Sequence, residues 1–157
     1  MSATLTLNEA REILRRAVEK AKEVAWISAY AVVDEGGNVI AISRMDEAPA
    51  AAAALARSKA YLAAVTGRNS ASFSARMDAH PVRFDGYQSI LPRPLFPGPG
   101  AMPIKKDGKV VGGFSSSLSS HEGGMKIEVD GKIVSREDIV TAYALGIDYV
   151  EQHADDP

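Results

Sequence analysis

Apolar runs interrupted by short acidic and glycine-containing turns recur three times along the chain, at residues 32–40, 103–111 and 126–134. β-Branched residues flank the turns, which contain the sequences Asp-Glu-Gly-Gly, Asp-Gly and Asp-Gly. Aspartate and glycine tolerate the positive φ of tight antiparallel turns, so this pattern indicates β-hairpins. The chain is therefore predicted to contain an antiparallel sheet.

The first hairpin is expected to join strands at about residues 28–34 and 38–45. Polar and apolar residues alternate only weakly in both strands, whereas a sheet with one wet face shows a clear alternation. We therefore expect both strands to be buried on two sides.

A helix is predicted ahead of this hairpin, from a capping box at Thr6 and Glu9 to about residue 24. Its apolar residues recur at steps of three and four opposite a charged face, which is typical of a helix lying on a sheet. The apolar positions are Leu7, Ala10, Leu14, Ala17, Val18, Ala21 and Ala25.

A second helix, predicted at residues 49–66, is dominated by alanine. Alanine has the highest helix propensity, which accounts for this composition without any function. The alternative is a thin helix face that packs against a partner subunit or a flat ligand. Lys59 is in phase with the apolar residues of this helix, and we favour an outward, solvated ammonium over one that stands within the apolar surface.

Regular structure is expected to weaken after this helix. Gly67 ends it, Ser70 caps a short helical turn to Met77, and residues 78–100 contain five prolines and three aromatic residues. Structureless segments of this length usually line a site or an interface. Two interpretations stay open: an arm packed across the sheet or onto a neighbouring subunit, and the wall of a pocket.

Two features follow the second hairpin. Residues 112–117, Gly-Gly-Phe-Ser-Ser-Ser, would present small side chains and free amides to a ligand, but a bulged strand end is the favoured interpretation. A last helix is predicted from a capping box at Ser135 and Asp138. Its expected apolar stripe comprises Ile139, Ala142, Tyr143, Gly146 and Val150.

Length and composition indicate a single soluble domain, residues 1–157. With 46% apolar residues, 24% charged residues and a net charge of −2, the chain is not expected to bind nucleic acid. It has no cysteine, which excludes disulfides, thiolate zinc sites and a thiol nucleophile. No segment is apolar enough for a membrane span and no secretory signal is evident, so a cytoplasmic location is expected.

Short motifs occur in an unbroken order over about 110 residues. They are Leu5-Thr6-Leu7 with Ala10, Val32-Val33-Asp34 with Gly37, Arg44-Met45-Asp46, Ala56, Lys59 and Ala60, Arg68 and Ser70, Pro97-Gly98, Pro103-Ile104, Asp107-Gly108, and Val110-Val111-Gly112. In this order they resemble the GlcG/HbpS-like family, which includes the C-terminal domain of PduO-type proteins and is often labelled haem-binding or haem-degrading. The resemblance implies an α+β fold with a profilin-like antiparallel sheet flanked by helices, and assembly into dimers or larger rings.

The hairpin at residues 126–134 departs from the family pattern, in which the last helix follows soon after the second hairpin. This extra β-hairpin lies next to the family's ligand region. We therefore expect it to reshape a pocket rim or to add an interface.

Haem or another tetrapyrrole is the ligand that the resemblance implies. An axial donor to iron would come from His80, His121, His153 or one of the five methionines. His121 is the best placed of these, because it follows the serine run at the mouth of the second hairpin.

Cationic residues at family-matching positions would hold the haem propionates. Arg44, Lys59 and Arg68 are the candidates, since guanidinium and ammonium groups bind carboxylates through charge-assisted hydrogen bonds. The small-residue segment would add cofactor contacts at Gly112 and Ser115.

A catabolic-pathway enzyme acting on a small carboxylate or an oxygenated ring compound is an alternative function. Arg44 or Arg68 would then bind an anionic group of the substrate, and a side chain whose pKa is shifted by burial would move a proton. The candidate acid–base residues are Lys59, Asp46, His121 and Glu122.

Two further expectations concern metals and assembly. Adjacent side chains on a strand point to opposite faces, so His121 and Glu122 do not form a convincing metal site and none is predicted. A third possible function is a non-catalytic assembly or sensing subunit. In that case the alanine helix and the proline-rich segment would serve a homo-oligomer.

Overall fold

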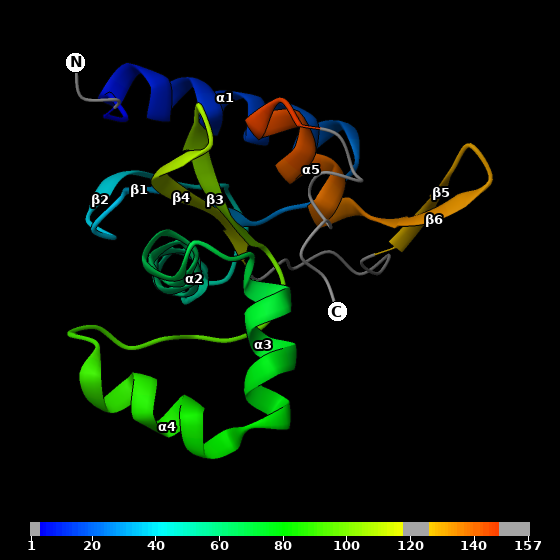
Figure 1. Ribbon diagram of the computed structural model, residues 1–157. Coiled ribbons are helices and arrows are strands. Elements are labelled where there is room, and N and C mark those ends of the chain that lie inside the picture. The colour runs from blue at the N-terminus through cyan, green and yellow to red at the C-terminus, as the bar shows by residue number, and fades with distance from the viewer. Residues whose placement is uncertain (1–3, 118–125, 148–157) are drawn as a thin grey trace.

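The computed structural model describes residues 4–117 and 126–147, which form an α+β fold around a four-stranded antiparallel sheet (Figure 1). The strands, which lie in the order β2-β1-β4-β3, are β1 (Ala29–Asp34), β2 (Val39–Arg44), β3 (Ala101–Lys106) and β4 (Lys109–Ser117). The predicted fold class and antiparallel sheet are confirmed.

Helices cover both faces of this sheet (Figure 1). α1 (Leu7–Glu23) and α5 (Arg136–Leu145) pack against each other on one face, and α2 (Ala52–Thr66) lies on the other. α3 (Ser70–Ala79) and α4 (Pro81–Ile90) follow α2 on that side, with α4 farthest from the sheet. A separate hairpin, β5 (Lys126–Val129) and β6 (Lys132–Ser135), projects from the body and leads into α5.

The hairpins form where the turn sequences predict them. Asp107 and Gly108 have φ values of 51° and 78°, and Asp130 and Gly131 have φ values of 52° and 78°. A two-residue turn of this kind requires positive φ at both central residues, which explains the recurrence of Asp-Gly. The predicted hairpin at residues 126–134 is thus confirmed together with the second one.

Burial differs between the two strands of the first hairpin. β1 lies inside the sheet and is buried from Ala29 to Val33, as its weak alternation predicted. β2 is an edge strand with exposed and half-buried residues, so the expectation of two-sided burial is wrong for it. The two strands have similar compositions, and only the position in the sheet distinguishes them.

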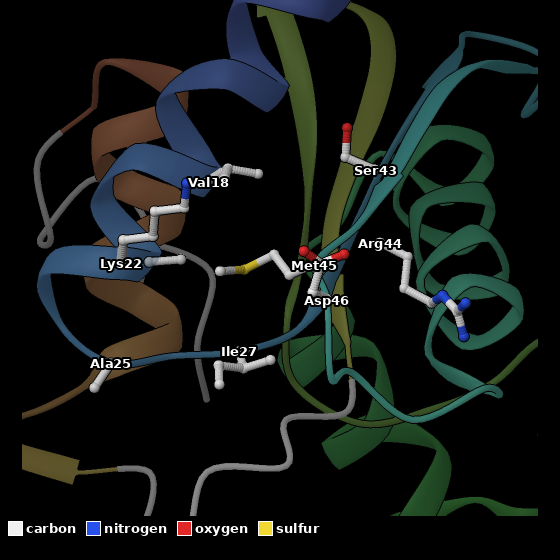
Figure 2. Close-up of a pocket in the computed structure, with 9 residues that line it drawn as sticks. Val18, Lys22, Ala25, Ile27, Ser43, Arg44, Met45 and Asp46 are labelled. Carbon is white, nitrogen blue, oxygen red and sulfur yellow. The ribbon is translucent and has the colours of Figure 1, made fainter.

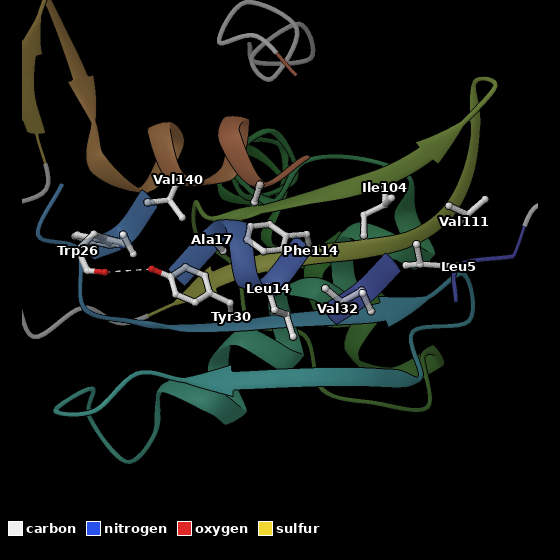
Figure 3. Close-up of a cluster of buried hydrophobic side chains, with 13 residues drawn as sticks. Leu5, Leu14, Ala17, Trp26, Tyr30, Val32, Ile104, Val111, Phe114 and Val140 are labelled. Carbon is white, nitrogen blue, oxygen red and sulfur yellow. Dashed lines mark hydrogen bonds between the residues drawn. The ribbon is translucent and has the colours of Figure 1, made fainter. Parts of the chain in front are cut away.

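The main hydrophobic core lies between the sheet and the helix pair α1 and α5 (Figure 3). Leu14 from α1 and Val140 from α5 meet Val32 and the stacked rings of Tyr30 and Phe114, whose centroids are 6.1 Å apart. The capping box predicted for α1 is present and begins the helix at the expected residue. The sequence pattern predicted the burial of Ala10, Leu14, Ala17 and Ala21 correctly, whereas Leu7 and Ala25 of the predicted stripe are exposed.

Small residues allow α2 to lie close to the opposite face of the sheet. Ala56, Ala60 and Ala64 are buried against the sheet, and a Cβ atom on Gly113 of β4 would overlap the carbonyl of Ala60. The alanine face thus packs on the chain's own sheet. It is not available to a partner subunit or a flat ligand, which was one of the two interpretations of this composition.

Residues 78–100 contain a helix that the sequence did not predict. α4 begins with Pro81 in its first turn, where the missing N–H of proline needs no partner, and it has no buried residue. α4 contacts the core through half-buried Phe84 and through Tyr87, whose ring packs edge-on against Phe73, and these two residues are too few to give a clear helical periodicity. The preceding helix, α3, is capped by the side chain of Asn69, which accepts from the Ser72 N–H at 2.7 Å, rather than by Ser70.

The buried face of α5 also differs from the predicted stripe. Its buried residues are Glu137, Val140, Thr141 and Ala144. Tyr143, expected in the core, is exposed, and Ile139 is half-buried. The predicted stripe was wrong because it was drawn through apolar residues, whereas two of the buried residues of α5, Glu137 and Thr141, are polar.

Within residues 4–117 and 126–147, no helix combines the length and apolar character needed to span a lipid bilayer.

Candidate functional site

Lys59 is buried at one end of the sheet, with 7% of its surface exposed. Its Nζ atom donates to the carbonyl of Pro99 at 2.9 Å and lies 5.8 Å from the ring centroid of Phe96. Burial lowers the pKa of Lys59, and the charge of Glu137 opposes that shift. The predicted outward, solvated ammonium is therefore wrong, because the segment before β3 covers Lys59 and supplies a carbonyl acceptor.

Glu137, in the first turn of α5, is 5% exposed and approaches the same segment. Its Oε1 atom is buried without a hydrogen-bond partner among the described residues. Burial raises the pKa of Glu137 to about 7, with Lys59 acting in the opposite direction. A Cβ atom on Gly100 would overlap Glu137 Oε1, so glycine at this position makes room for the carboxyl group.

The strand ends around the Pro99–Gly100 peptide carry polar side chains. Trp26 Nε1 donates to Ser116 Oγ at 3.0 Å, and the Ser116 N–H donates to the Gly100 carbonyl at 2.9 Å. Ser117 Oγ, the next hydroxyl along β4, is buried and has no hydrogen-bond partner in the described part of the chain. Lys59 and Glu137 thus reach a polar sheet end from α2 and α5. We call this arrangement the Lys59–Glu137 site.

Sequence reasoning named Lys59 as a candidate residue but missed Glu137. An acidic residue in the first turn of a helix is normally explained by the helix dipole, which favours a negative charge there. Nothing in the local sequence indicates that this carboxyl group faces inward. Its burial follows from the way α5 docks on β4 and α1.

A second candidate site is a hollow of about 490 Å³ between the end of α2, α3 and α4, here called the α3–α4 hollow. It brings together Arg68 and His80, two residues that sequence analysis proposed for haem. Two further guanidinium groups, those of Arg76 and Arg83, also line it. Its remaining lining residues are Val65, Thr66, Phe73, Met77, Tyr87 and Leu91.

A third hollow, of about 480 Å³, lies between α1 and the end of β2 and contains the predicted residues Arg44 and Asp46 (Figure 2). Met45 extends toward α1 and Lys22, whereas the side chain of Arg44 extends away from them (Figure 2). Both Arg44 and Asp46 are exposed. This hollow therefore offers a mixed, solvent-facing surface.

The three predicted cations do not converge on one ligand. Arg44 lies in the hollow beside β2, Lys59 at the buried sheet end, and Arg68 in the α3–α4 hollow. Two of these hollows contain a candidate axial donor: Arg68 shares the α3–α4 hollow with His80 and Met77, and Arg44 shares its hollow with Met45. Among the described residues that line these hollows, the one candidate histidine is His80, which lies beside Arg68.

Gly112 and Ser115 are packing residues in this structure. A Cβ atom on Gly112 would overlap the carbonyl of Val33, and Ser115 is fully buried within the central strand β4. Both form part of the pairing of β4 with β1 and β3, so neither presents a free amide to a cofactor. The expectation that they contact a cofactor is corrected by this packing.

Three other candidates, His121, Glu122 and His153, lie outside the described residues. Within the described part of the chain, no group of three or more histidine, aspartate or glutamate residues is arranged to hold a metal ion.

The chain is similar in sequence to a known protein family and to one of its members. The family model described as "Haem degrading protein HbpS-like" matches residues 5–120. Protein GlcG of Escherichia coli K12 is 28% identical over 114 residues, which cover 72% of this chain and 81% of GlcG.

Solved structures show the same fold. A double mutant of HbpS from Streptomyces reticuli has a TM-score of 0.69 and 26% identity, with 92% of this chain and 84% of that chain covered. A PduOC complex with haem has a TM-score of 0.71 and 21% identity, with coverages of 92% and 94%, and supports a likeness of fold. Because the family model spans most of the chain, the protein belongs to the GlcG/HbpS-like family that its sequence motifs resemble.

Proposed function

We propose that this protein binds haem or another tetrapyrrole in the α3–α4 hollow. The observation that carries the proposal is the meeting of Arg68 and His80, which lie twelve positions apart in the chain and line the same hollow. The description of the family as haem-degrading and the haem complex of PduOC, a protein of the same fold, favour this class of ligand.

The residues of the hollow fit the parts of a haem group. Phe73, Met77 and Leu91 offer an apolar wall to a macrocycle. Guanidinium groups hold carboxylates through charge-assisted hydrogen bonds, so Arg68, together with the other two arginines of the hollow, would hold the propionates. His80, at the junction of α3 and α4, would offer an imidazole nitrogen to the haem iron.

Titration of the purified protein with haemin tests the proposal. We expect a Soret shift that saturates at a fixed stoichiometry and that changes position in His80→Ala. Arg68→Ala should weaken haemin binding about tenfold, which corresponds to the loss of one charge-assisted hydrogen bond of about 1.5 kcal/mol. Arg44→Ala is the matched control, because it removes an arginine from a different hollow.

Two results would contradict the proposal. A spectrum identical to that of free haemin would exclude haem binding. A spectral change caused by His121→Ala and absent in His80→Ala would retain haem as ligand and move its site away from the α3–α4 hollow. In that second case Arg68→Ala would behave like the Arg44→Ala control.

A further inference from the structure

The two edges of the four-stranded sheet differ in their resistance to pairing with another strand. β3, at one edge, contains Pro103, which lacks an N–H group, and the cations Lys105 and Lys106. Proline and lysine on an edge strand hinder the addition of a further strand. β2, at the other edge, has the sequence Val-Ile-Ala-Ile-Ser-Arg, which contains neither residue. In the described part of the chain no strand pairs with the outer side of β2, so this edge is open.

The backbone of β2 offers hydrogen bonds at the open edge. The Met45 N–H donates to the Ser28 carbonyl at 3.1 Å, so the backbone groups of Met45 point toward β1. Hydrogen bonding alternates along an antiparallel strand, and the backbone groups of Ile42 and Arg44 therefore point away from β1. This regular pairing extends to Ala41, where a bulge interrupts it. An added strand would thus bind opposite residues 41–45.

A groove lies along β2 on the side of α1. It comprises two hollows of about 490 Å³ and 480 Å³ that share Val18 of α1 and Ser43 of β2, and we call it the α1–β2 groove. Met45 of β2 extends into it toward α1 (Figure 2). Its larger apolar lining residues are Leu7, Leu14, Val18, Ile40, Ile42 and Met45. Successive side chains of a strand point to opposite faces, so every second side chain of an added strand would enter this groove.

Positive charge borders the groove. Its charged lining residues are four cations and one carboxylate, namely Arg11, Arg15, Lys22, Arg44 and Asp46. Arg15 forms ion pairs with Glu12 and Glu19, whereas within the described residues the other three cations form none. The groove is therefore positive in a chain whose net charge is −2. This charge favours an acidic partner over a second copy of β2, which would bring the same cations into the contact.

We propose that the α1–β2 groove binds an extended acidic segment of another protein, in which apolar residues alternate with aspartate or glutamate. The segment adds to the sheet beside β2 through backbone hydrogen bonds to Ile42 and Arg44. Its apolar side chains enter the groove beside Met45. Its acidic side chains lie on the opposite face, toward which the Arg44 side chain extends, and Arg11 and Lys22 attract the segment to the groove. This binding does not depend on haem.

Fluorescence polarisation with labelled peptides tests the proposal. The acidic probe is Glu-Val-Glu-Val-Glu-Val-Glu. Lys-Val-Lys-Val-Lys-Val-Lys keeps the alternation and reverses the charge, whereas Val-Val-Val-Glu-Glu-Glu-Glu keeps the composition and removes the alternation. We expect the acidic probe to bind saturably and each control peptide to bind more weakly by about tenfold or more.

The variant Ile42→Pro tests whether the backbone of β2 takes part in binding. It removes the outward N–H group of residue 42 and no hydrogen bond to β1, so the edge strand should tolerate it, as β3 tolerates Pro103. We expect the acidic probe to bind about tenfold more weakly, which is the effect of one lost hydrogen bond. Ile42→Val is the matched control, because it keeps the N–H group and should bind as the unchanged protein does.

Charge reversal provides a test that does not depend on Ile42→Pro. Lys22→Glu/Arg44→Glu should weaken binding of the acidic probe by about tenfold or more and should strengthen binding of the lysine peptide. Lys105→Glu/Lys109→Glu makes the same change in charge at exposed positions of β3 and β4. At physiological salt this control should change neither affinity by more than about twofold.

Amide hydrogen exchange distinguishes strand addition from other modes of binding. The N–H groups of Ile42 and Arg44 should exchange rapidly in the free protein and slowly in the complex with the acidic probe. The proposal fails if this probe does not bind saturably, if the non-alternating peptide binds equally well, or if Ile42→Pro and Ile42→Val bind alike. Unchanged exchange at both amides would also contradict it. Protection of these amides in the free protein that is lost on dilution would assign the edge to a second copy instead.

Discussion

Glu137 couples the protonation of a buried carboxyl group to folding. Its pKa is about 7 in the folded protein and 4.5 in its ordinary state, because burial disfavours the charged form. Between these values the folded protein keeps a proton that the unfolded chain has released. The free energy of unfolding therefore falls as the pH rises from 4.5 to 7, by up to about 3 kcal/mol, and this loss is complete above pH 7.

Glu137→Gln should remove this contribution to the pH dependence. At each pH we compare the free energy of unfolding of the variant with that of the unchanged protein. We expect this difference to favour the variant by about 2 to 3 kcal/mol more at pH 8 than at pH 5. Urea unfolding at both pH values measures it, with Glu128→Gln on β5 as the control that should show no such difference. Equal relative stabilities of Glu137→Gln at the two pH values would show that Glu137 is not a buried titrating group.

The burial of Lys59 and Glu137 could not be predicted from the residues near them in the sequence. Lys59 is in phase with an apolar face of its helix, but the direction of its side chain depends on whether a carbonyl acceptor lies beside that face. That carbonyl belongs to Pro99, forty residues away. The sequence around Glu137 does not indicate that its carboxyl group is buried, because this burial depends on a space beside Gly100 that exists only in the folded chain.

At the scale of elements, α2 can lie close to β4 because position 113 has no side chain. A Cβ atom there would overlap the Ala60 carbonyl and stand 3.1 Å from the amide nitrogen of Ala64. Gly113→Ala should therefore destabilise the fold by about 1–3 kcal/mol, the usual range for overpacking a core. Urea unfolding at a fixed pH measures the loss.

Gly86→Ala provides the matched control for this prediction. Gly86 lies within α4, and a Cβ atom there meets nothing within 4 Å. Replacing glycine by alanine inside a helix stabilises it by roughly 0.5–1 kcal/mol, so this variant should be neutral or slightly more stable. If both variants behaved alike, the close packing of α2 on β4 would not be a source of stability.

Elements with strong local signals were predicted well. Asp-Gly turns and the capping box of α1 specify their geometry through neighbouring residues, and the structure contains them at the expected positions. β2 and α4 were misjudged for the opposite reason. Whether a strand lies at a sheet edge, and whether a helix with few apolar contacts forms at all, depends on contacts with distant parts of the chain.

At the scale of the whole molecule, the candidate residues are distributed over several surfaces. Residues of similar chemistry, such as Arg44, Lys59 and Arg68, were grouped from the sequence because each suits an anionic ligand. Their distribution over an edge strand, a buried sheet end and a hollow beside α3 follows from the sheet order and from the side on which each helix packs. Family membership predicts this scaffold but does not decide which of its surfaces binds a ligand.

The outer surface of α4 bears on the predicted homo-oligomer. Val82 and Ile90 are 84% and 82% exposed, although both are large apolar residues, and α4 has no buried residue. Exposed apolar side chains of this kind favour association, and the alanine face of α2 is already covered by the sheet. We therefore expect self-association to involve α4 rather than α2.

Light scattering tests this prediction on Val82→Ser/Ile90→Ser. The unchanged protein should have the mass of a dimer or larger assembly, and the double variant should have a lower mass at the same concentration. Val129→Ser/Ile133→Ser on the projecting hairpin is the control for a general loss of exposed apolar surface. α4 also contributes Arg83 and Tyr87 to the α3–α4 hollow, so haemin should shift the association equilibrium of the unchanged protein. An unchanged protein that has the mass of a monomer would contradict the prediction.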